Sequence, residues 1–303
     1  MASEIESLLE YALNIGASEL IVTEGAPSAV RFAGRVCAVP ESTALPFGSL
    51  LEFLGALDGE SGTFVGGPWV NTKWRVKYFR EALGNAAIFR PLMAECPDFT
   101  SLGAPASLDS LLGLSSGLVI FAGPACSGKT VTATSYVSAM CNSGILRFCD
   151  LDEGHELPVK TGESLKLVNT VGSTSEKLEQ GLRSGTDLFW LGDFDGSSLI
   201  SILRAAESGA LVVLNVTAGN AVGVIDALLF GVSPENRDLV RTMLAASLKA
   251  VVVQRLLPAA TEGGGAVSAW EILFNTQNVA AYIRSGEQFK LFTPHPTSVT
   301  PQP

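Results

Sequence analysis

The chain has 303 residues, of which 47% are hydrophobic and 17% are charged. This length suffices for two domains with separate cores, and the composition is that of a globular protein rather than a disordered chain. The formal net charge of −10 argues against a general nucleic-acid-binding protein, because such proteins need clustered lysine and arginine to displace counterions.

Several kinds of segment and site are not expected. The sequence contains no apolar run of about eighteen residues, so we expect no membrane span. It begins without a basic segment followed by an apolar stretch, so we expect no secretion signal. The cysteines are scattered and odd in number, which is typical of reduced thiols in a cytoplasm, and two histidines without paired cysteines make a zinc site unlikely on composition.

The N-terminal part of the chain is predicted to form a small α+β domain over residues 1–98. Apolar residues at helical spacing predict a helix over 4–15. The alternating stretch 74–80 and its partner 87–90, joined by a turn near Gly84, predict antiparallel strands. The other expected elements are a strand over 20–22, a hairpin around Ala33-Gly34 and a short helix over 49–57.

A linker is predicted over 99–116, which is rich in Ser, Gly, Leu and Pro and includes a short helix over 108–112. It leads to an α/β domain over 117–303. The apolar runs of this domain are 118–122, 145–149, 188–191 and 211–216. Because they alternate with helical stretches such as 198–207, we expect a largely parallel sheet covered by helices.

The last part of the chain is predicted to open with a long helix. Ser233 is the expected N-cap, Pro234 takes the first helical position, and Pro258 marks the limit of the helix. A glycine-rich loop over 259–266 follows, then a strand over 272–274 and a helix over 279–283.

The most specific motif is a glycine-rich stretch between a buried apolar run and a predicted helix. It reads Gly123-Pro124-Ala125-Cys126-Ser127-Gly128-Lys129-Thr130. The two outer glycines let the backbone turn so that its N–H groups converge on a phosphate, Lys129 adds charge at the outer phosphates, and the Thr130 hydroxyl is placed to ligate Mg²⁺. The helix that follows aims its positive end at the same anion. The sequence therefore predicts a nucleotide phosphate site, against the alternative of a glycine-rich turn without a ligand.

Carboxylates follow two of the predicted strands. Asp150, Asp152, Glu153 and Glu156 follow the run 145–149, and Asp193 and Asp195 follow the run 188–191. Ligands of α/β sheets bind off the carboxyl ends of the strands, so these acids are candidates to hold a metal-bound water and to orient the attacking water. The alternative for each is a solvated loop acid or a helix cap.

With these motifs in view, the sequence resembles the type IV pilus retraction ATPases, within the wider type II/IV secretion ATPase superfamily. The resemblance extends from Ala17 to about Gly286. Beside the phosphate loop it rests on Gly25-Ala26-Pro27, Arg75-Val76, Phe79-Arg80, Leu182-Arg183, Ala206-Glu207-Ser208-Gly209, Gln254-Arg255-Leu256-Leu257-Pro258, Glu271-Ile272-Leu273 and Ile283-Arg284-Ser285-Gly286.

The resemblance implies an α/β fold with a RecA-like P-loop NTPase domain and a smaller N-terminal α+β, PAS-like domain. It implies ATP and Mg²⁺ as cofactors and a homohexameric ring, or a mixed ring with a paralogue. It also implies a cytoplasmic location, peripheral to the inner membrane through a pilus or secretion platform protein. In such a ring ATP binding and hydrolysis shift the two domains against each other and drive pilin removal.

The same resemblance assigns roles to single residues. Lys129 and Thr130 match the phosphate and Mg²⁺ contacts. Asp193 stands at the position of the Walker B glutamate, and Asp152 at that of the catalytic glutamate. Three arginines of the N-terminal strands, Arg75, Arg80 and Arg90, match those that the family sends to a neighbouring subunit's nucleotide; the alternative is a solvated strand face.

The chain also departs from the family pattern. Both the acidic-box and the Walker B acids are aspartates instead of glutamates, although Glu153 can replace Asp152 after a one-residue shift. The His-box histidines are replaced by Ala210 and Thr217. Withdrawing a carboxylate by about 1 Å can cost on the order of 10²-fold in rate, so ATP binding is expected to be retained and hydrolysis to be slow. Cys126 replaces a loop glycine, either as a tolerated small side chain or as a thiol activated by the helix N-terminus.

Three functions are compatible with these observations. The first is a Mg²⁺-dependent motor ATPase with slow turnover. The second is a nucleotide-binding adaptor or regulator without useful turnover, acting beside an active paralogue. The third, a small-molecule kinase, requires a lid with phosphate-binding arginines, and residues 140–190 offer only Arg147 and Arg183.

Overall fold

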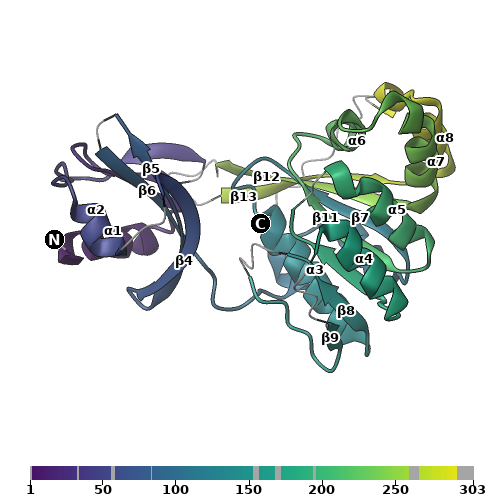
Figure 1. Ribbon diagram of the computed structural model, residues 1–303, viewed down its shortest axis with the longest axis horizontal. Coiled ribbons are helices and arrows are strands. Elements are labelled where there is room, and N and C mark those ends of the chain that lie inside the picture. The colour runs from purple at the N-terminus through teal and green to yellow at the C-terminus, as the bar shows by residue number, and fades with distance from the viewer. Residues whose placement is uncertain are drawn as a thin grey trace. The chain divides into compact units, whose positions relative to one another are not determined.

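The chain folds into two compact units. The computed structural model describes residues 2–32, 34–55, 59–82, 84–152, 157–167, 172–193, 196–258 and 266–291 (Figure 1). The first unit is Met1–Glu95 with Leu256–Val267, and the second is Cys96–Arg255 with Ser268–Pro303. The finer domain boundaries expected from the sequence, at 98/99 and 116/117, stay a prediction.

The first unit is an antiparallel sheet with two helices on one face. Its elements are α1 (Ala2–Asn14), β1 (Glu19–Thr23), β2 (Ala29–Phe32), β3 (Arg35–Ala38), α2 (Ser49–Leu54), β4 (Ser61–Trp69), β5 (Thr72–Glu81) and β6 (Gly84–Pro91). The strand order is β3-β2-β1-β6-β5-β4. Side chains of alternate strand residues point to one face, where Trp74, Val76 and Phe89 pack with Ile5 and Leu9 of α1. The expected N-terminal helix, hairpins and strands are confirmed, and β4 was not foreseen.

The second unit contains a largely parallel sheet, as expected. Its strands are β7 (Gly117–Ala122), β8 (Arg147–Asp150), β9 (Leu165–Leu167), β10 (Leu188–Leu191), β11 (Leu211–Val216), β12 (Leu248–Pro258) and β13 (Ala266–Phe274). They lie in the order β13-β12-β7-β11-β10-β8-β9. The pairs from β12 to β9 in this order are all parallel. Their carboxyl ends therefore meet at one edge of the sheet.

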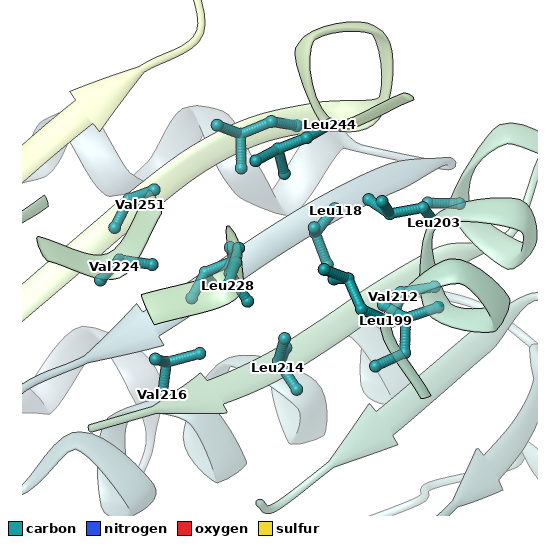
Figure 2. Packing of buried hydrophobic residues seen from close by; sticks show 14 of the residues in the cluster. Leu118, Leu199, Leu203, Val212, Leu214, Val216, Val224, Leu228, Leu244 and Val251 are labelled. Atoms are coloured by element: carbon teal, nitrogen blue, oxygen red, sulfur yellow. The ribbon is translucent and has the colours of Figure 1, made fainter. Parts of the chain in front are cut away.

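Helices cover both faces of this sheet, which explains why its strands are continuous apolar runs. They are α3 (Lys129–Ser143), α4 (Thr174–Arg183), α5 (Leu199–Glu207), α6 (Ala221–Phe230), α7 (Arg237–Ser247) and α8 (Gln277–Ser285), with 3₁₀ turns η1 (Phe99–Leu102), η2 (Ala106–Gly113), η3 (Gly196–Ser198), η4 (Pro234–Asn236) and η5 (Gln288–Leu291). Leu118 of β7 faces the cluster formed with α4 to α8, whereas the next residue, Val119, faces the cluster formed with α3, η1 and η2. Figure 2 shows the first cluster, in which side chains of β7, β11 and β12 meet those of α5, α6 and α7.

The sequence predicts one long helix from Ser233 to the region of Pro258, and this prediction is wrong. The helix α7 ends at Ser247, and residues 248–258 form the strand β12 beside β7. A strand that is buried on both faces shows apolar residues at every position, so residues four apart fit a helical pattern as well as a strand. The β-branched run Val251-Val252-Val253 favours the extended form.

The predicted linker 99–116 contains η1 and η2, and Phe99, Leu108 and Leu111 are buried in the core of the second unit. The expected helix over 108–112 lies within η2. In the parts of the chain that the structure describes, no helix has the length and apolar character that crossing a bilayer requires.

Candidate nucleotide site

The glycine-rich stretch connects β7 to α3, as the sequence predicts. A Cβ atom at Gly123 would lie 2.3 Å from the Gln254 carbonyl oxygen and from Ser127 Oγ. Gly128 has a φ of 84°, in the left-handed region that favours glycine. Glycine is therefore required at Gly123 by close packing and favoured at Gly128 by backbone conformation.

The amino end of α3 is built to receive an anion. Gly128 is its N-cap, no side chain caps it, and no acidic residue lies in the first turn. The first N–H groups of a helix have no partner within the helix and carry its positive dipole end. Lys129 and Thr130 are half-buried at this end. The buried hydroxyl of Ser127 has no hydrogen-bond partner among the described residues, so its hydrogen-bonding capacity is available to a polar ligand.

Gln254 of β12 packs against the phosphate loop and the first turns of α3. Its Oε1 accepts a hydrogen bond from Thr132 Oγ1 at 2.7 Å, and its Nε2 donates to Ser268 Oγ at 3.3 Å. The residue is 5% exposed. Sequence reasoning noted Gln254 as part of a family motif but gave it no role, because it placed the segment in a helix. The available signal was a polar residue, Gln254, directly after the apolar run Val251-Val252-Val253.

Asn215 of β11 is a second residue that sequence reasoning missed. It is 2% exposed, and its Nδ2 donates to Thr130 Oγ1 at 3.4 Å. Its Oδ1 has no hydrogen-bond partner among the residues that the structure describes. It is the polar member of the otherwise apolar strand Leu211–Val216, and a buried polar residue at a strand end next to the phosphate loop was the available signal.

The two predicted acidic segments come together because β8 and β10 are neighbours in the sheet. Leu151 N donates to the Trp190 carbonyl at 2.8 Å. Asp152 is 8% exposed and lies against Gly192: a Cβ atom on this glycine would be 1.9 Å from Asp152 Oδ1. The side chain of Asp193, the next residue, is exposed. Asp152 and Asp193 are thus held at the same sheet edge as the phosphate loop.

Asp150 fixes the turn that carries Asp152. Its Oδ1 accepts a hydrogen bond from Asp152 N at 3.1 Å, and its Oδ2 pairs with Lys166 Nζ at 2.8 Å. Asp150 therefore serves as a support rather than as an open carboxylate. Glu153 and Glu156 lie outside the described residues, as does Asp195.

Cys126 adopts a φ of 61° in the loop, where the family pattern has glycine. A residue with a Cβ pays about 1 kcal/mol or more in this left-handed region. The side chain is half-buried. Burial raises the pKa of Cys141 and of Cys149 to about 11, so these two thiols stay protonated and unreactive at neutral pH. The cysteines, which all lie in the described residues, form no disulfides with one another.

The three predicted arginines belong to the first unit and do not form one cluster. Arg75 and Arg90 lie opposite each other on β5 and β6. Arg90 pairs with Glu19 at 2.6 Å, and Glu19 also pairs with Arg31 at 2.7 Å. Because strand side chains alternate, Arg80 points to the opposite face of the sheet from Arg75. It lines a pocket of about 260 Å³ within the first unit, between α2, β5 and β6.

Among the described residues, no group of three or more His, Cys, Asp and Glu side chains could hold a metal by itself. Mg²⁺ does not need such a cage, because it keeps several waters and binds through one or two protein oxygens together with substrate phosphates. The Thr130 hydroxyl, which is contacted by Asn215 Nδ2, and the carboxylates at this sheet edge supply oxygen ligands of this kind. The residues present therefore fit Mg²⁺ bound with a nucleotide.

Comparisons with known proteins agree with this architecture. The family model described as "Type II/IV secretion system protein" matches residues 91–285. The chain is 27% identical to the type IV pilus retraction ATPase PilT of Pseudomonas aeruginosa, over 96% of this chain and 88% of the relative. It is 28% identical to the uncharacterized protein YggR of Escherichia coli, over 96% of this chain and 91% of that protein.

Solved structures show the same fold. The pilus retraction motor PilT with bound ADP matches with a TM-score of 0.74 at 26% identity, covering 95% of this chain and 88% of that chain. The ATPase DotB of Legionella pneumophila matches with a TM-score of 0.77 at 15% identity, covering 95% and 85%. The second match shows the fold alone. Together they confirm the expected fold class, a RecA-like P-loop NTPase unit with a smaller N-terminal α+β, PAS-like unit.

Proposed function

From the premise that the chain belongs to the type II/IV secretion system protein family, where its resemblance to the pilus retraction ATPases is confirmed, we propose that it is a motor ATPase with slow turnover. It binds ATP with Mg²⁺ and serves a type IV pilus or a secretion-like machine. The observation that carries the proposal is the meeting of the phosphate loop, Asp152 and Asp193 at the carboxyl edge of one parallel sheet.

Nucleotide binding depends on the loop and the start of α3. The N–H groups of residues 123–130 and the helix dipole hold the phosphates, and Lys129 adds a positive charge at the outer phosphates. The Thr130 hydroxyl would hold Mg²⁺, which neutralises charge on the phosphates, with Asp193 accepting hydrogen bonds from a metal-bound water. Gly123, Ser127 and Gly128 shape the cradle, and Pro124, Ala125 and Cys126 complete its turn.

Hydrolysis needs a carboxylate that orients the attacking water and accepts its proton. Asp152 is the candidate, with Glu153 as the alternative after a one-residue shift. Asp152 is one methylene shorter than the glutamate of the family pattern, and its Oδ1 packs against Gly192. A carboxylate about 1 Å from its productive position can lose on the order of 10²-fold in rate, which is why we propose slow turnover.

The test compares intact protein with the variant Lys129→Ala. We expect wild type to bind ATP and ADP in the presence of Mg²⁺ and to release phosphate slowly, and we expect Lys129→Ala to lose both properties, because the loop then lacks its charge at the outer phosphates. Isothermal titration measures binding and a coupled phosphate assay measures turnover. Lys160→Ala, which removes a half-exposed lysine of the same unit, serves as the control. Wild type without nucleotide affinity at millimolar concentrations would refute the proposal.

The shortened acids also favour a second candidate function. A chain that binds nucleotide without useful turnover would act as an adaptor or regulator beside an active paralogue, switching with nucleotide occupancy alone. Wild-type phosphate release equal to that of Lys129→Ala, together with intact ADP binding, would establish this alternative and exclude the motor.

The same family membership supports a proposal about assembly. We propose a ring, a homohexamer or a mixed ring with a paralogue, in which Arg75, Arg80 and Arg90 reach the nucleotide of a neighbouring subunit. Glu19 pairs with Arg90 within the subunit, so part of the charge of Arg90 is already compensated there. The partner is a pilus or secretion platform protein at the inner membrane, which places the ring in the cytoplasm. Sedimentation that shows only monomer, with and without ATP analogue, would refute the ring.

A further inference from the structure

Asn215 lies in the sheet beside the strand that leads into the phosphate loop, and its side chain reaches Thr130 of α3. It lies on β11, which pairs with β7 on one side and with β10 on the other. The register sets it opposite Phe121, near the end of the strand that leads into the phosphate loop. The other members of β11 are apolar and buried. An amide in this position costs folding free energy unless its polar atoms are used.

The structure uses only part of the hydrogen-bonding capacity of this amide. Nδ2 donates to Thr130 Oγ1 at 3.4 Å, a long hydrogen bond, and Oδ1 accepts none. A buried acceptor without a partner is unfavourable and uncommon. The hydroxyl that Nδ2 contacts, that of Thr130, is the candidate Mg²⁺ ligand.

The chemistry of that hydroxyl changes when a metal binds. A threonine hydroxyl has one proton to donate and two lone pairs to offer. Coordination to Mg²⁺ takes one lone pair and polarises the O–H bond, so the proton then needs a good acceptor. Asn215 can supply this acceptor, because rotation of its side-chain amide brings Oδ1 to the position that Nδ2 occupies.

We propose that Asn215 is a positioning residue that couples nucleotide affinity to metal occupancy. Without metal its Nδ2 donates to Thr130 Oγ1; with metal its Oδ1 accepts the Thr130 proton and holds the Oγ1 lone pair toward Mg²⁺. This inference rests on the proposed nucleotide function and adds to it a specific residue and a metal-dependent switch. Asn215 touches neither phosphate nor water in this role, since it acts through Thr130.

The test measures a coupling factor, the ATP dissociation constant in EDTA divided by that in Mg²⁺, by isothermal titration of the intact protein. Asn215→Leu removes both donor and acceptor, and we expect the factor to fall about tenfold, the worth of a hydrogen bond to a charged or metal-bound group. Asn215→Asp keeps the acceptor and adds negative charge. It should weaken metal-free ATP binding and preserve Mg·ATP binding, so that its coupling factor rises.

The matched control is Asn275→Asp, the same change in a half-buried amide of the same unit. Asn275 Nδ2 donates to the carbonyl of Ala245 in α7 and to that of Leu248 at the start of β12, and its Oδ1 also lacks a partner among the described residues. Leu248 pairs with the start of β7, so this amide lies at the opposite end of the sheet from the loop. We expect this control to change thermal stability and to leave the coupling factor unchanged.

The outcomes separate this inference from the proposed function. If Asn215→Leu fails to fold, the coupling factor of Asn215→Asp decides: a rise supports the inference, and the absence of a rise overturns it. If both variants change the two dissociation constants by the same factor, Asn215 is only a packing residue and the inference is overturned alone. If the wild type binds no nucleotide with or without Mg²⁺, the proposed function fails first.

Discussion

The two halves of the nucleotide site differ in how much of the family pattern they keep. The phosphate half, formed by β7, α3, β11 and β12, retains the required glycines, the lysine and the threonine, and supports them with the buried amides Gln254 and Asn215. The acidic half, formed by the ends of β8 and β10, has shortened both of its candidate acids. The proposed site assigns binding and hydrolysis to different strands, so we expect substitutions to affect the two separately.

The largest expected effect comes from replacing Asp152, in the acidic half of the site, by the longer glutamate. Asp152→Glu extends the carboxylate by about 1 Å, and we expect turnover to rise by up to about 10²-fold with an unchanged ADP dissociation constant. Steady-state phosphate release and titration with ADP measure the two quantities. Asp226→Glu, the same change on the surface of α6, is the control. A change in ADP affinity as large as that in turnover would show that the two halves act as one.

The next effect concerns the support of the first half. Gln254→Leu leaves Thr132 Oγ1 buried without its acceptor, so we expect a loss of about 2–3 kcal/mol in unfolding free energy and weaker nucleotide binding. Urea unfolding and ADP titration measure these. Gln254→Glu restores the acceptor for Thr132 and serves as the comparison variant. Equal losses in both variants would mean that packing, and not the Thr132 hydrogen bond, sets the contribution of Gln254.

The smallest effect concerns the one residue of the loop with a strained backbone. Cys126→Gly removes the Cβ from a left-handed conformation, and we expect a gain of about 0.5–1 kcal/mol in stability, since the greater freedom of glycine in the unfolded chain offsets part of the relief. Thermal unfolding measures the gain. Cys126→Ala keeps the Cβ and should show no gain; a gain of equal size there would assign the effect to the thiol.

The elements that were predicted correctly are those whose signals lie close together in the sequence. The β7–loop–α3 unit was foreseen because its glycines, lysine and flanking patterns are contiguous, and β10 and β11 because short apolar runs allow few other structures. The strand β4 was missed, since Gly66, Gly67 and Pro68 suggest a loop. The helix α4 was not foreseen, although Ser173 and Glu176 form a capping box that marks its start.

The site was predicted where residues are adjacent in sequence and missed where tertiary structure assembles it. Lys129 and Thr130 are consecutive, whereas Gln254 and Asn215 reach the loop from strands far away in the chain. Asp152 was identified, but its packing against Gly192 follows from the pairing of β8 with β10, which no local pattern contains. Periodicity could not separate α7 from β12, because both bury residues four apart.

The strand β12 has a mechanical consequence. Gln254 accepts a hydrogen bond from Thr132, next to the proposed phosphate loop. Two residues later the same strand enters the segment Leu256–Val267, which belongs to the first unit. A polypeptide backbone scarcely lengthens, because its bonds and peptide planes are stiff. A displacement of β12 at Gln254 is therefore transmitted to Leu256 almost without loss. The strand is thus a stiff covalent connection between the proposed nucleotide site and the first unit.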